Sequence, residues 1–531
     1  MLSNSDEENV ADGSTRSGNA RFGRREVLHG ISTTVLGGVL LGGTASAETT
    51  TDRIDRYFEE FGTVVDIVEA GADDTGRESV VDVIREYRAD DTLLVFPPGE
   101  YYMDEQVRFS GFENFGLVGN DATLIPADYY DFAGPQYRLF RLGVPYNPGN
   151  RLVFDGFDVD QTSPDTGIRV IETVVDDGLE VRNVTVHGEH DSGTWGPGSF
   201  AVSDPAGTGL VEAFEVPDGG AWEDETPNEG NIWRGPTGLL ANSNSGTLTF
   251  RDCVVGAFPD NGLYASGGDG TIRVEGGHFS NSNAACLRIG GDGSSIRGAT
   301  VVVDQNRPRD ESHRGIRLER GGDIEVRDVT VRNTAPLPNS FGISVMNSCT
   351  SAWIENADVT ISGDEVTNGI VTSPNCGEVV VLESRVEMHT PGGFGIEIND
   401  GDNTGRVLCE YVDFVGSVGD ETAKAAVRND RDETRLGAVT VDQSGGSQRR
   451  AVVNTGDDVT IFKGEYRASE LPIIDIGDGT HVEEIYAESY GDEEAYSLYP
   501  DSANVYLKRN TLRGGIKDHG CDGLETLGNE F

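Results

Sequence analysis

The four residues Gly315-Ile316-Arg317-Leu318 are one copy of a phrase that recurs along the chain between Gly238 and Val453. The phrase is a glycine or other small residue, an aliphatic residue, any residue, and then an aliphatic or small residue. Successive copies lie 24, 24, 29, 27, 27 and 26 residues apart and begin at Gly238, Gly262, Cys286, Gly315, Gly342, Gly369 and Gly395. Repeats of about 20 to 50 residues are typical of solenoids. Short apolar stretches divided by Gly, Asn and Asp indicate that the repeating unit is built from β-strands.

The chain is strongly acidic. Its 531 residues include 41 Lys and Arg against 91 Asp and Glu, which gives a net charge of −50. Nucleic acids and anionic membranes attract basic surfaces, so this charge excludes broad electrostatic binding to either of them. Carboxylates spread over a surface keep a protein soluble in concentrated salt, and this favours a salt-adapted (halophilic) protein. The other interpretation is that the charge attracts a specific cationic partner.

The N-terminal residues have the order of an export signal. Arg24-Arg25 is a twin-arginine pair, an apolar run extends over 31–41, and Ala45-Ser46-Ala47 is a small-residue cleavage sequence. We interpret 1–47 as a twin-arginine signal peptide and 48–63 as a linker. The apolar run is too short to span a bilayer and no later segment is apolar enough, so we expect no stable membrane insertion. The predicted location is extracellular or at the cell surface.

The segment after the linker predicts how the solenoid begins. Ala70-Gly71-Ala72-Asp73-Asp74-Thr75-Gly76 precedes an amphipathic helix expected over Glu78–Arg88, and Phe96-Pro97-Pro98-Gly99-Glu100-Tyr101 follows it. This stretch resembles the N-terminal cap of the pectate-lyase-like right-handed β-helix superfamily. The resemblance implies an all-β, right-handed parallel β-helix whose open apolar end is covered by the N-terminal capping helix. We place the β-helix at 64–485, and a terminal coil and C-terminal cap at 486–531.

Residues 187–236 interrupt the repeat and are predicted to form an insertion. They contain three of the four tryptophans of the chain, Trp195, Trp222 and Trp233. Loops of solenoids often project from one face and carry binding residues. Exposed indole rings can stack on sugar rings, so these three residues are candidates for substrate binding. The alternative is that they pin the insertion against the coils.

Outward side chains of consecutive coils identify a candidate site. Neighbouring residues of a strand face opposite sides, so burying the aliphatic residue of each phrase points the next residue outward. The column predicted in this way consists of Tyr264, Arg288, Arg317 and Ser344, and the residues expected beside it are Asp260, His313, Arg314 and Glu319. Guanidiniums bind carboxylates through paired hydrogen bonds, which predicts an acidic, uronate-containing polysaccharide as partner. The alternative is that the arginines only bridge carboxylates of the protein itself.

These residues could support β-elimination of a uronate. Arg288 or Arg317 would neutralise the carboxylate, and His313, Tyr264 or an arginine of lowered pKa would act as the base. Asp260 and Glu319 are further candidates for substrate binding. The other enzymatic interpretation is glycoside hydrolysis, which needs two carboxylates flanking the bond. A non-catalytic cell-surface or carbohydrate-binding solenoid is the alternative to an enzyme.

Motifs that the chain lacks narrow this choice. β-Helix polygalacturonases carry Asn-Thr-Asp, Asp-Asp, Gly-His-Gly and Arg-Ile-Lys motifs, and only acidic pairs such as Asp176-Asp177 occur here. This departure argues against polygalacturonase activity. The expected chemistry requires no cofactor, and although Ca²⁺ could bind carboxylates, no spaced loop motif marks a site.

Two cysteines occupy equivalent positions of neighbouring repeats. Cys349 and Cys376 are 27 residues apart, at the same offset from their glycines. Neighbouring coils of a solenoid lie about 4.8 Å apart, which is within the range that a disulfide tolerates. The two residues therefore form either a disulfide, which an external compartment permits, or a pair of stacked buried thiols.

Overall fold

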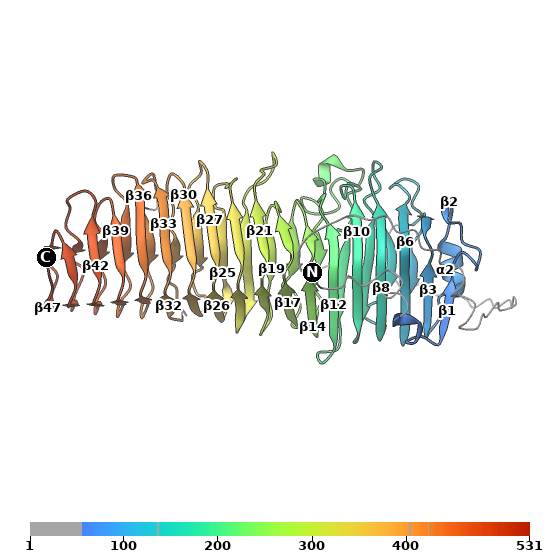
Figure 1. The fold of residues 1–531 in the computed structure, drawn as a ribbon, viewed down its shortest axis with the longest axis horizontal. Helices are drawn as coiled ribbons and strands as arrows, with labels where there is room; N and C mark the ends of the chain where they lie inside the picture. The colour runs from blue at the N-terminus through green and yellow to red at the C-terminus, as the bar shows by residue number, and fades with distance from the viewer. Residues whose placement is uncertain (1–55, 135–136, 403–404, 423) are drawn as a thin grey trace, which may run out of the picture.

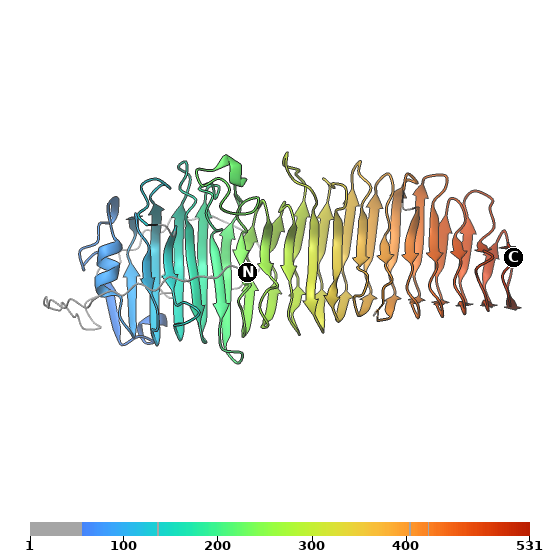
Figure 2. The same ribbon diagram turned by 180° about the vertical axis from the view of Figure 1, so that it is seen from behind.

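The protein is an elongated solenoid (Figure 1). The computed structural model describes residues 56–134, 137–402, 405–422 and 424–531. Its strands stack along the long axis from the N-terminal coils at one end to the C-terminal coils at the other, and the view from behind shows the same stacking (Figure 2). The predicted signal peptide at 1–47 lies outside the described residues.

Two sheets build the solenoid, and neighbouring strands within them run parallel. One sheet has 16 strands: β5 Val107–Phe109, β7 Arg138–Leu142, β9 Arg169–Val175, β11 Gly198–Val202, β13 Leu239–Leu240, β16 Asn261–Ala265, β19 Ala285–Ile289, β22 Arg314–Gly321, β25 Phe341–Cys349, β28 Asn368–Thr372, β31 Ile396–Ile398, β34 Ala425–Asn429, β37 Arg450–Asn454, β40 Ile473–Asp475, β43 Tyr496–Leu498 and β46 Ile516–Asp518. The repeated phrases lie in this sheet, which confirms the predicted β-solenoid.

The other sheet has 31 strands: β1 Thr63–Asp66, β2 Thr75–Ser79, β3 Thr92–Phe96, β4 Gly99–Met103, β6 Asn114–Pro126, β8 Arg151–Asp160, β10 Leu179–His187, β12 Thr208–Val216, β14 Thr247–Arg251, β15 Val254–Val255, β17 Thr271–Glu275, β18 His278–Ser280, β20 Ser295–Arg297, β21 Thr300–Val303, β23 Ile324–Arg327, β24 Thr330–Asn333, β26 Ser351–Glu355, β27 Asp358–Ser362, β29 Glu378–Leu382, β30 Arg385–His389, β32 Val407–Glu410, β33 Asp413–Val418, β35 Arg435–Gly437, β36 Thr440–Gly445, β38 Thr460–Phe462, β39 Glu465–Ala468, β41 His481–Glu483, β42 Tyr486–Ser489, β44 Tyr506–Lys508, β45 Thr511–Arg513 and β47 Glu525–Leu527.

Within most coils, the 31-stranded sheet turns a sharp corner between two consecutive strands. Asp328 forms the corner between β23 and β24 with φ 55°, and Asn356 forms the next corner, between β26 and β27, with φ 52°. Asp and Asn adopt this left-handed conformation more readily than most residues because their short polar side chains bond locally. The Asn and Asp residues between the repeated strands are therefore what allows each coil to close.

The aliphatic residues of the repeated phrase stack inside the solenoid. Leu263, Leu287, Ile316, Ile343 and Ile370 pair in register from one strand to the next, and each is 0% exposed. Fully burying one such side chain contributes about 1.5–3 kcal/mol. The repeat thus supplies one core contact to every coil and fixes which residues face outward.

Helix α2, Val81–Tyr87, lies at the N-terminal end of the solenoid (Figure 1). It falls within the predicted span Glu78–Arg88, and its buried residues Val81 and Ile84 join the main hydrophobic core. The described end of the predicted linker is also packed, because Tyr57 and Phe61 are buried against outward side chains of β3, β6 and β8. The apolar end of the first coils is therefore covered, as the resemblance implied.

The predicted insertion at 187–236 contains two strands of the solenoid. Strands β11 and β12 pair with neighbouring coils in the two sheets, because Phe200, Val202, Val211 and Phe214 face inward and are buried. The projecting parts are the loop before β11 and the longer loop from β12 to β13, which includes the short 3-10 helix η2, Glu223–Glu225. The tryptophans therefore belong to two separate loops and not to one insertion.

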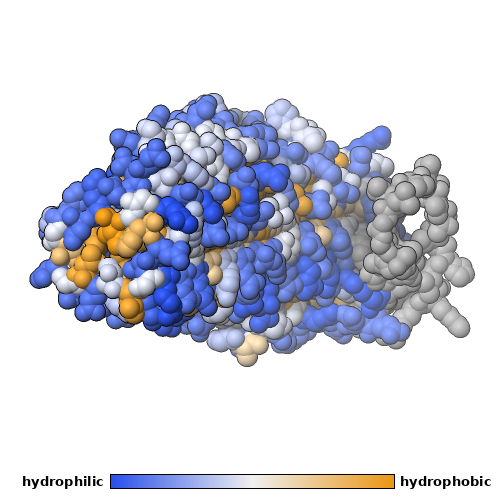
Figure 3. All heavy atoms as spheres, turned by 60° about the vertical axis from the view of Figure 1, so that its left-hand side comes forward, coloured by the Kyte–Doolittle hydropathy of each residue, from blue (hydrophilic) through white to orange (hydrophobic). Residues whose placement is uncertain are grey.

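Residues 486–531 continue the coils to the C-terminal end. They contain six strands, β42 to β47, and no helix. Figure 3 brings this end forward and shows a mostly hydrophilic surface with an apolar patch at the C-terminal end. Leu527 and Phe531, which are 55% and 63% exposed, are in these last residues.

The cysteines of the described residues are all free thiols. Cys349 and Cys376 are both buried, and a guanidinium nitrogen of Arg431 lies 3.2 Å from the sulfur of Cys376. Of the two alternatives for this pair, the structure shows the stacked thiols.

Candidate functional site

The predicted column is present on the outer side of the 16-stranded sheet. Tyr264 of β16 pairs with Arg288 of β19, Arg288 pairs with Arg317 of β22, and Arg317 pairs with Ser344 of β25. The aliphatic residues that precede Tyr264 and the two arginines are fully buried, so these three side chains point away from the core. The register therefore confirms the stacking on which the candidate site depends.

Glu319 joins the two arginines of the column. Its Oε1 lies 3.1 Å from Nη2 of Arg288, and its Oε2 lies 2.5 Å from Nε of Arg317. The guanidinium of Arg288 also covers the ring of Tyr264 at 4.2 Å from the centroid, which is a cation–π contact. Glu319 thus orients both guanidiniums and fills part of their hydrogen-bonding capacity.

The charge of Glu319 is stabilised by this arrangement. Burial alone would raise the pKa of Glu319, but the hydrogen bond from Arg317 and the positive charge of Arg288 outweigh it and leave the pKa below its usual range. Glu319 is therefore an anion at neutral pH, and it neutralises only one of the positive charges around it.

Arg314 is a third arginine at this site, three residues before Arg317 on β22. Its guanidinium lies 5.5 Å from the ring centroid of Phe341, and its buried Nε has no hydrogen-bond partner. Burial, and then the like charges of Arg317 and Arg288, lower the pKa of Arg314. Among the residues that the structure describes, no carboxylate forms an ion pair with it. We call Arg288, Arg314, Arg317 and Glu319 the central arginine cluster.

Sequence reasoning placed Arg314 beside the column without giving it a role. The sequence signal that could have assigned Arg314 to the binding site is the spacing Arg314-Gly315-Ile316-Arg317, which puts a second arginine before the outward residue of the same phrase. What the spacing does not reveal is that Arg314 lacks the carboxylate partner that Arg288 and Arg317 share.

His313 lies inside the protein and not beside the column. Its side chain is 0% exposed, with Nδ1 3.1 Å from the carbonyl oxygen of Ser282 and Nε2 3.1 Å from Oδ1 of Asn306. Burial lowers its pKa. The predicted position was wrong because His313 ends an irregular loop, where the alternation of a strand does not decide the direction of a side chain.

The three candidate tryptophans differ in exposure. Trp195 and Trp233 are 55% and 67% exposed, in the loops before β11 and β13. Trp222 is only 6% exposed and packs under the guanidinium of Arg307, 5.0 Å from the ring centroid. Trp222 therefore pins its loop. Trp195 and Trp233 are exposed, although the guanidinium of Arg234 covers the Trp233 ring from 4.3 Å.

Asp260 lies at the turn that precedes β16. Its Oδ2 accepts a hydrogen bond from Thr237 at 2.8 Å, and its Oδ1 accepts one from the side chain of Asn261 at 2.9 Å. These contacts tie the turn before β16 to the end of the loop that carries Trp233. Asp260 thus fixes the conformation of the turn that leads into the strand of Tyr264.

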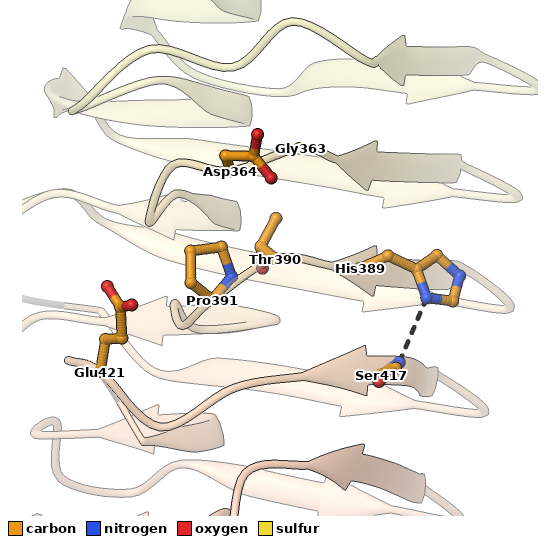
Figure 4. A pocket seen from close by; sticks show the side chains of 7 residues that line it. All are labelled: Gly363, Asp364, His389, Thr390, Pro391, Ser417 and Glu421. Atoms are coloured by element: carbon orange, nitrogen blue, oxygen red, sulfur yellow. Dashed lines mark hydrogen bonds between the residues drawn. The ribbon is translucent and has the colours of Figure 1, made fainter.

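A hollow of about 460 Å³ lies on the C-terminal side of the central arginine cluster, at the loops after β27, β30 and β33, and begins in the coil that follows the coil of Arg317. Figure 4 shows His389 at one side, with the backbone N–H of Ser417 donating to its Nδ1 at 3.3 Å, and the carboxylates of Asp364 and Glu421 at the other side. Two carboxylates would repel an acidic polymer. The hollow is therefore distinct from the arginine column.

The described ranges, 56–134, 137–402, 405–422 and 424–531, contain no group of three or more His, Cys, Asp or Glu side chains that could hold a metal ion. The same ranges contain no helix that is long and apolar enough to cross a membrane.

The comparisons with known proteins agree with the architecture. A family model described as the right handed beta helix region matches residues 230–403. The chain is a right-handed parallel β-helix. The matched residues extend from β13 to β31 and include the whole of the column and the central arginine cluster. No curated protein sequence matches this β-helix.

Solved structures similar to this β-helix include a surface adhesin and polysaccharide-acting enzymes. The adhesin PfbA of Streptococcus pneumoniae is 9% identical over 88% of this chain and 99% of its own, with a TM-score of 0.33. An exopolygalacturonase of Yersinia enterocolitica is 13% identical over 84% of this chain and 78% of its own, with a TM-score of 0.29. The mannuronan C-5 epimerase AlgE4 A-module of Azotobacter vinelandii is 11% identical over 87% and 96%, with a TM-score of 0.25.

Proposed function

We propose that the central arginine cluster binds carboxylates of an extracellular acidic polysaccharide. The observation that carries this proposal is a cluster of three arginines and one carboxylate in a protein of net charge −50. Arg288 and Arg317 pair with Glu319, and Arg314 adds a third positive charge close enough to lie within their electrostatic influence. The buried Nε of Arg314 has no acceptor, and leaving such a donor unsatisfied costs about 1–3 kcal/mol. A ligand carboxylate would balance the excess positive charge of the cluster.

A linear polymer fits this site better than a small acid. The side chains of Tyr264, Arg288 and Arg317 repeat along the solenoid axis at the spacing of neighbouring strands, about 4.8 Å. The exposed rings of Trp195 and Trp233 lie in loops that precede strands of the same sheet. The predicted export signal would bring this face into contact with polymers outside the cell.

Among the reactions of such a polymer, β-elimination of a uronate suits the residues present. The arginines would neutralise the carboxylate, which acidifies the proton next to it, and Tyr264 as its phenolate or Arg314 as its neutral guanidine would receive that proton. The adjacent glycosidic C–O bond then breaks, a C–C double bond forms, and the leaving oxygen takes up a proton. His313 has no part in this scheme because its side chain is buried.

The test is to incubate the mature protein with polyuronates in concentrated salt and to measure binding and products. Unsaturated ends that absorb in the ultraviolet indicate a lyase, new reducing ends without that absorbance indicate a hydrolase, and binding without product indicates a carbohydrate-binding protein. Arg314→Ala should weaken binding at least tenfold. Arg297→Ala is the matched control, because Arg297 is an exposed arginine on β20 of the other sheet. If neither wild-type binding nor turnover is found, the proposal is wrong.

A further inference from the structure

A second arginine cluster lies nearer the N-terminus on the 16-stranded sheet. Glu172 of β9 is within 2.6 Å of Nε of Arg138, 3.2 Å of Nε of Arg141 and 2.6 Å of Nη1 of Arg169. Three guanidiniums surround this carboxylate, and two of them come from an Arg-x-x-Arg sequence, Arg138-Leu139-Phe140-Arg141, the spacing also found at Arg314 and Arg317. We call these four residues the N-terminal arginine cluster.

The N-terminal arginine cluster is held firmly. Arg169 is 4% exposed, and its Nε donates to the carbonyl oxygen of Gly196 at 2.9 Å. Burial lowers the pKa of Arg169 to about 10, which leaves it charged at neutral pH. Arg141 has a second cation, Arg108, as its partner in register on β5. The cluster is therefore a preformed patch of positive charge on a strongly acidic protein.

Each cluster contributes two residues to one outward column of the 16-stranded sheet. In register from strand to strand, that column contains Arg108, Arg141, Glu172, Ser199, Leu240, Tyr264, Arg288 and Arg317. Four strand steps separate β9 from β19, which at about 4.8 Å per step is a distance of roughly 19 Å. The two patches therefore lie along the same straight line, parallel to the solenoid axis.

The segment between the clusters is uncharged in this column and flanked by exposed aromatic rings. Ser199, Leu240 and Tyr264 occupy the intervening positions. Trp195 and Trp233 lie in the loops that lead into β11 and β13, the first two strands after β9 in the direction of β19. The guanidinium of Arg169 is 6.0 Å from the ring centroid of Trp195, so the aromatic segment begins at the N-terminal arginine cluster.

We propose that the two arginine clusters bind a single carboxylated polysaccharide at two points, with the sugar rings between them lying beside Trp195 and Trp233. This rests on the proposed function and adds a length requirement to it. A trisaccharide is too short to reach from one cluster to the other, whereas a dodecasaccharide is long enough. Binding at two linked points raises affinity because the second contact forms at a high effective concentration.

Calorimetric titration with size-fractionated uronate oligosaccharides tests the two-point arrangement. Two trisaccharides should bind each chain, but only one dodecasaccharide, with an affinity roughly a hundredfold higher or more, which is the lower end of the gains from linked sites. Arg141→Ala should remove one trisaccharide site and reduce the dodecasaccharide affinity to that of the trisaccharide. Arg138→Ala is a second variant of the same cluster, and Arg297→Ala, on the other sheet, should bind as wild type does. Thermal unfolding identifies any variant that fails to fold.

The outcomes separate the two proposals. In one outcome, each chain binds a single trisaccharide, Arg317→Ala abolishes this binding, Arg141→Ala does not affect it, and the dodecasaccharide binds no more tightly. This outcome would overturn two-point binding and keep the proposed function. Absence of binding for every uronate oligosaccharide would overturn both. A sulfated dodecasaccharide that binds more tightly than the carboxylated one would overturn the assignment of the ligand as a carboxylated polymer.

Discussion

Replacing Glu319 by glutamine should separate ligand binding from stability at the central arginine cluster. Glu319→Gln keeps the shape of the side chain but removes the charge that Arg288 and Arg317 share at 3.1 and 2.5 Å. A ligand carboxylate competes with Glu319 for these two guanidiniums. Removing the internal competitor should therefore strengthen binding of an acidic polymer while it weakens the fold.

The expected sizes follow from the geometry. At an effective dielectric constant of about 20, each ion pair has roughly 5 kcal/mol of gross Coulomb attraction. Desolvation cancels most of it, and the side chains of Arg288, Arg317 and Glu319 remain 18%, 17% and 23% exposed, so the net contribution is about 1 kcal/mol per pair. We expect Glu319→Gln to lower the free energy of unfolding by about 2 kcal/mol. We expect the affinity for a uronate oligosaccharide to rise roughly tenfold, which corresponds to about 1.4 kcal/mol.

Urea unfolding and calorimetric titration measure the two effects on the same samples. The matched control is Glu325→Gln, since Glu325 of β23 lies 2.5 Å from Arg297 and 3.5 Å from Arg327 but belongs to the other sheet. It should lose stability and gain no affinity. If Glu319→Gln folds but binds the uronate oligosaccharide no more tightly than wild type does, the reasoning is refuted. The arginines would then serve only to pair with Glu319.

The pH dependence provides an independent check of the same ion pairs. Because the pKa of Glu319 is lowered in the folded protein, its stabilisation is complete above the ordinary carboxyl pKa of about 4.3 and is lost as the pH falls through the lowered value. Wild type and Glu319→Gln should therefore differ in stability at neutral pH and converge in acid. A difference that persists in acid would mean that the glutamine disturbs packing and not charge.

Two further predictions concern buried groups. Trp222→Ala should destabilise the fold by about 3–5 kcal/mol because Trp222 is 6% exposed. Trp233→Ala should change stability by less than about 0.5 kcal/mol and should weaken polysaccharide binding. Equal unfolding midpoints for the two variants would contradict this. Asp475→Asn should stabilise the protein at neutral pH, because burial raises the pKa of Asp475 and a raised pKa means that stability is lost as the pH rises. Asn454 and Tyr496, which donate to Asp475 at 2.9 and 2.7 Å, keep a polar partner in the variant. The gain should disappear in acid, and a variant no more stable than wild type at pH 7 would refute the prediction.

The repeat made the fold and the column predictable. A period set by one glycine and one aliphatic residue per coil determines both which side chains are buried and which side chains of neighbouring coils pair. Tyr264, Arg288 and Arg317 could be aligned for this reason before any coordinate was known. The capping helix was likewise predictable, because Val80, Val83, Ile84 and Tyr87 recur at a helical spacing beside a motif with a known structural context.

The parts that the sequence did not predict lie where the repeat fails. His313 and Trp222 are in irregular loops, and their burial depends on contacts with distant residues such as Ser282 and Arg307. The N-terminal arginine cluster was missed because β7 and β9 carry bulkier phrases without the leading glycine, so Arg141 and Glu172 could not be aligned with the later column. The pairing of Glu319 with two arginines needs the actual side-chain positions, since many carboxylates of this chain could have filled that role.

The parallel register of the 16-stranded sheet makes the distance between the two arginine clusters adjustable in fixed increments. Each repeat between them adds one strand and about 4.8 Å, and its inward residues are interchangeable aliphatic ones. Deleting or duplicating a whole repeat, such as the one beginning at Gly238, would shorten or lengthen the span by one increment without altering either cluster. The protein is in this sense a molecular ruler, whose preferred polymer length could be reset by changing the number of coils.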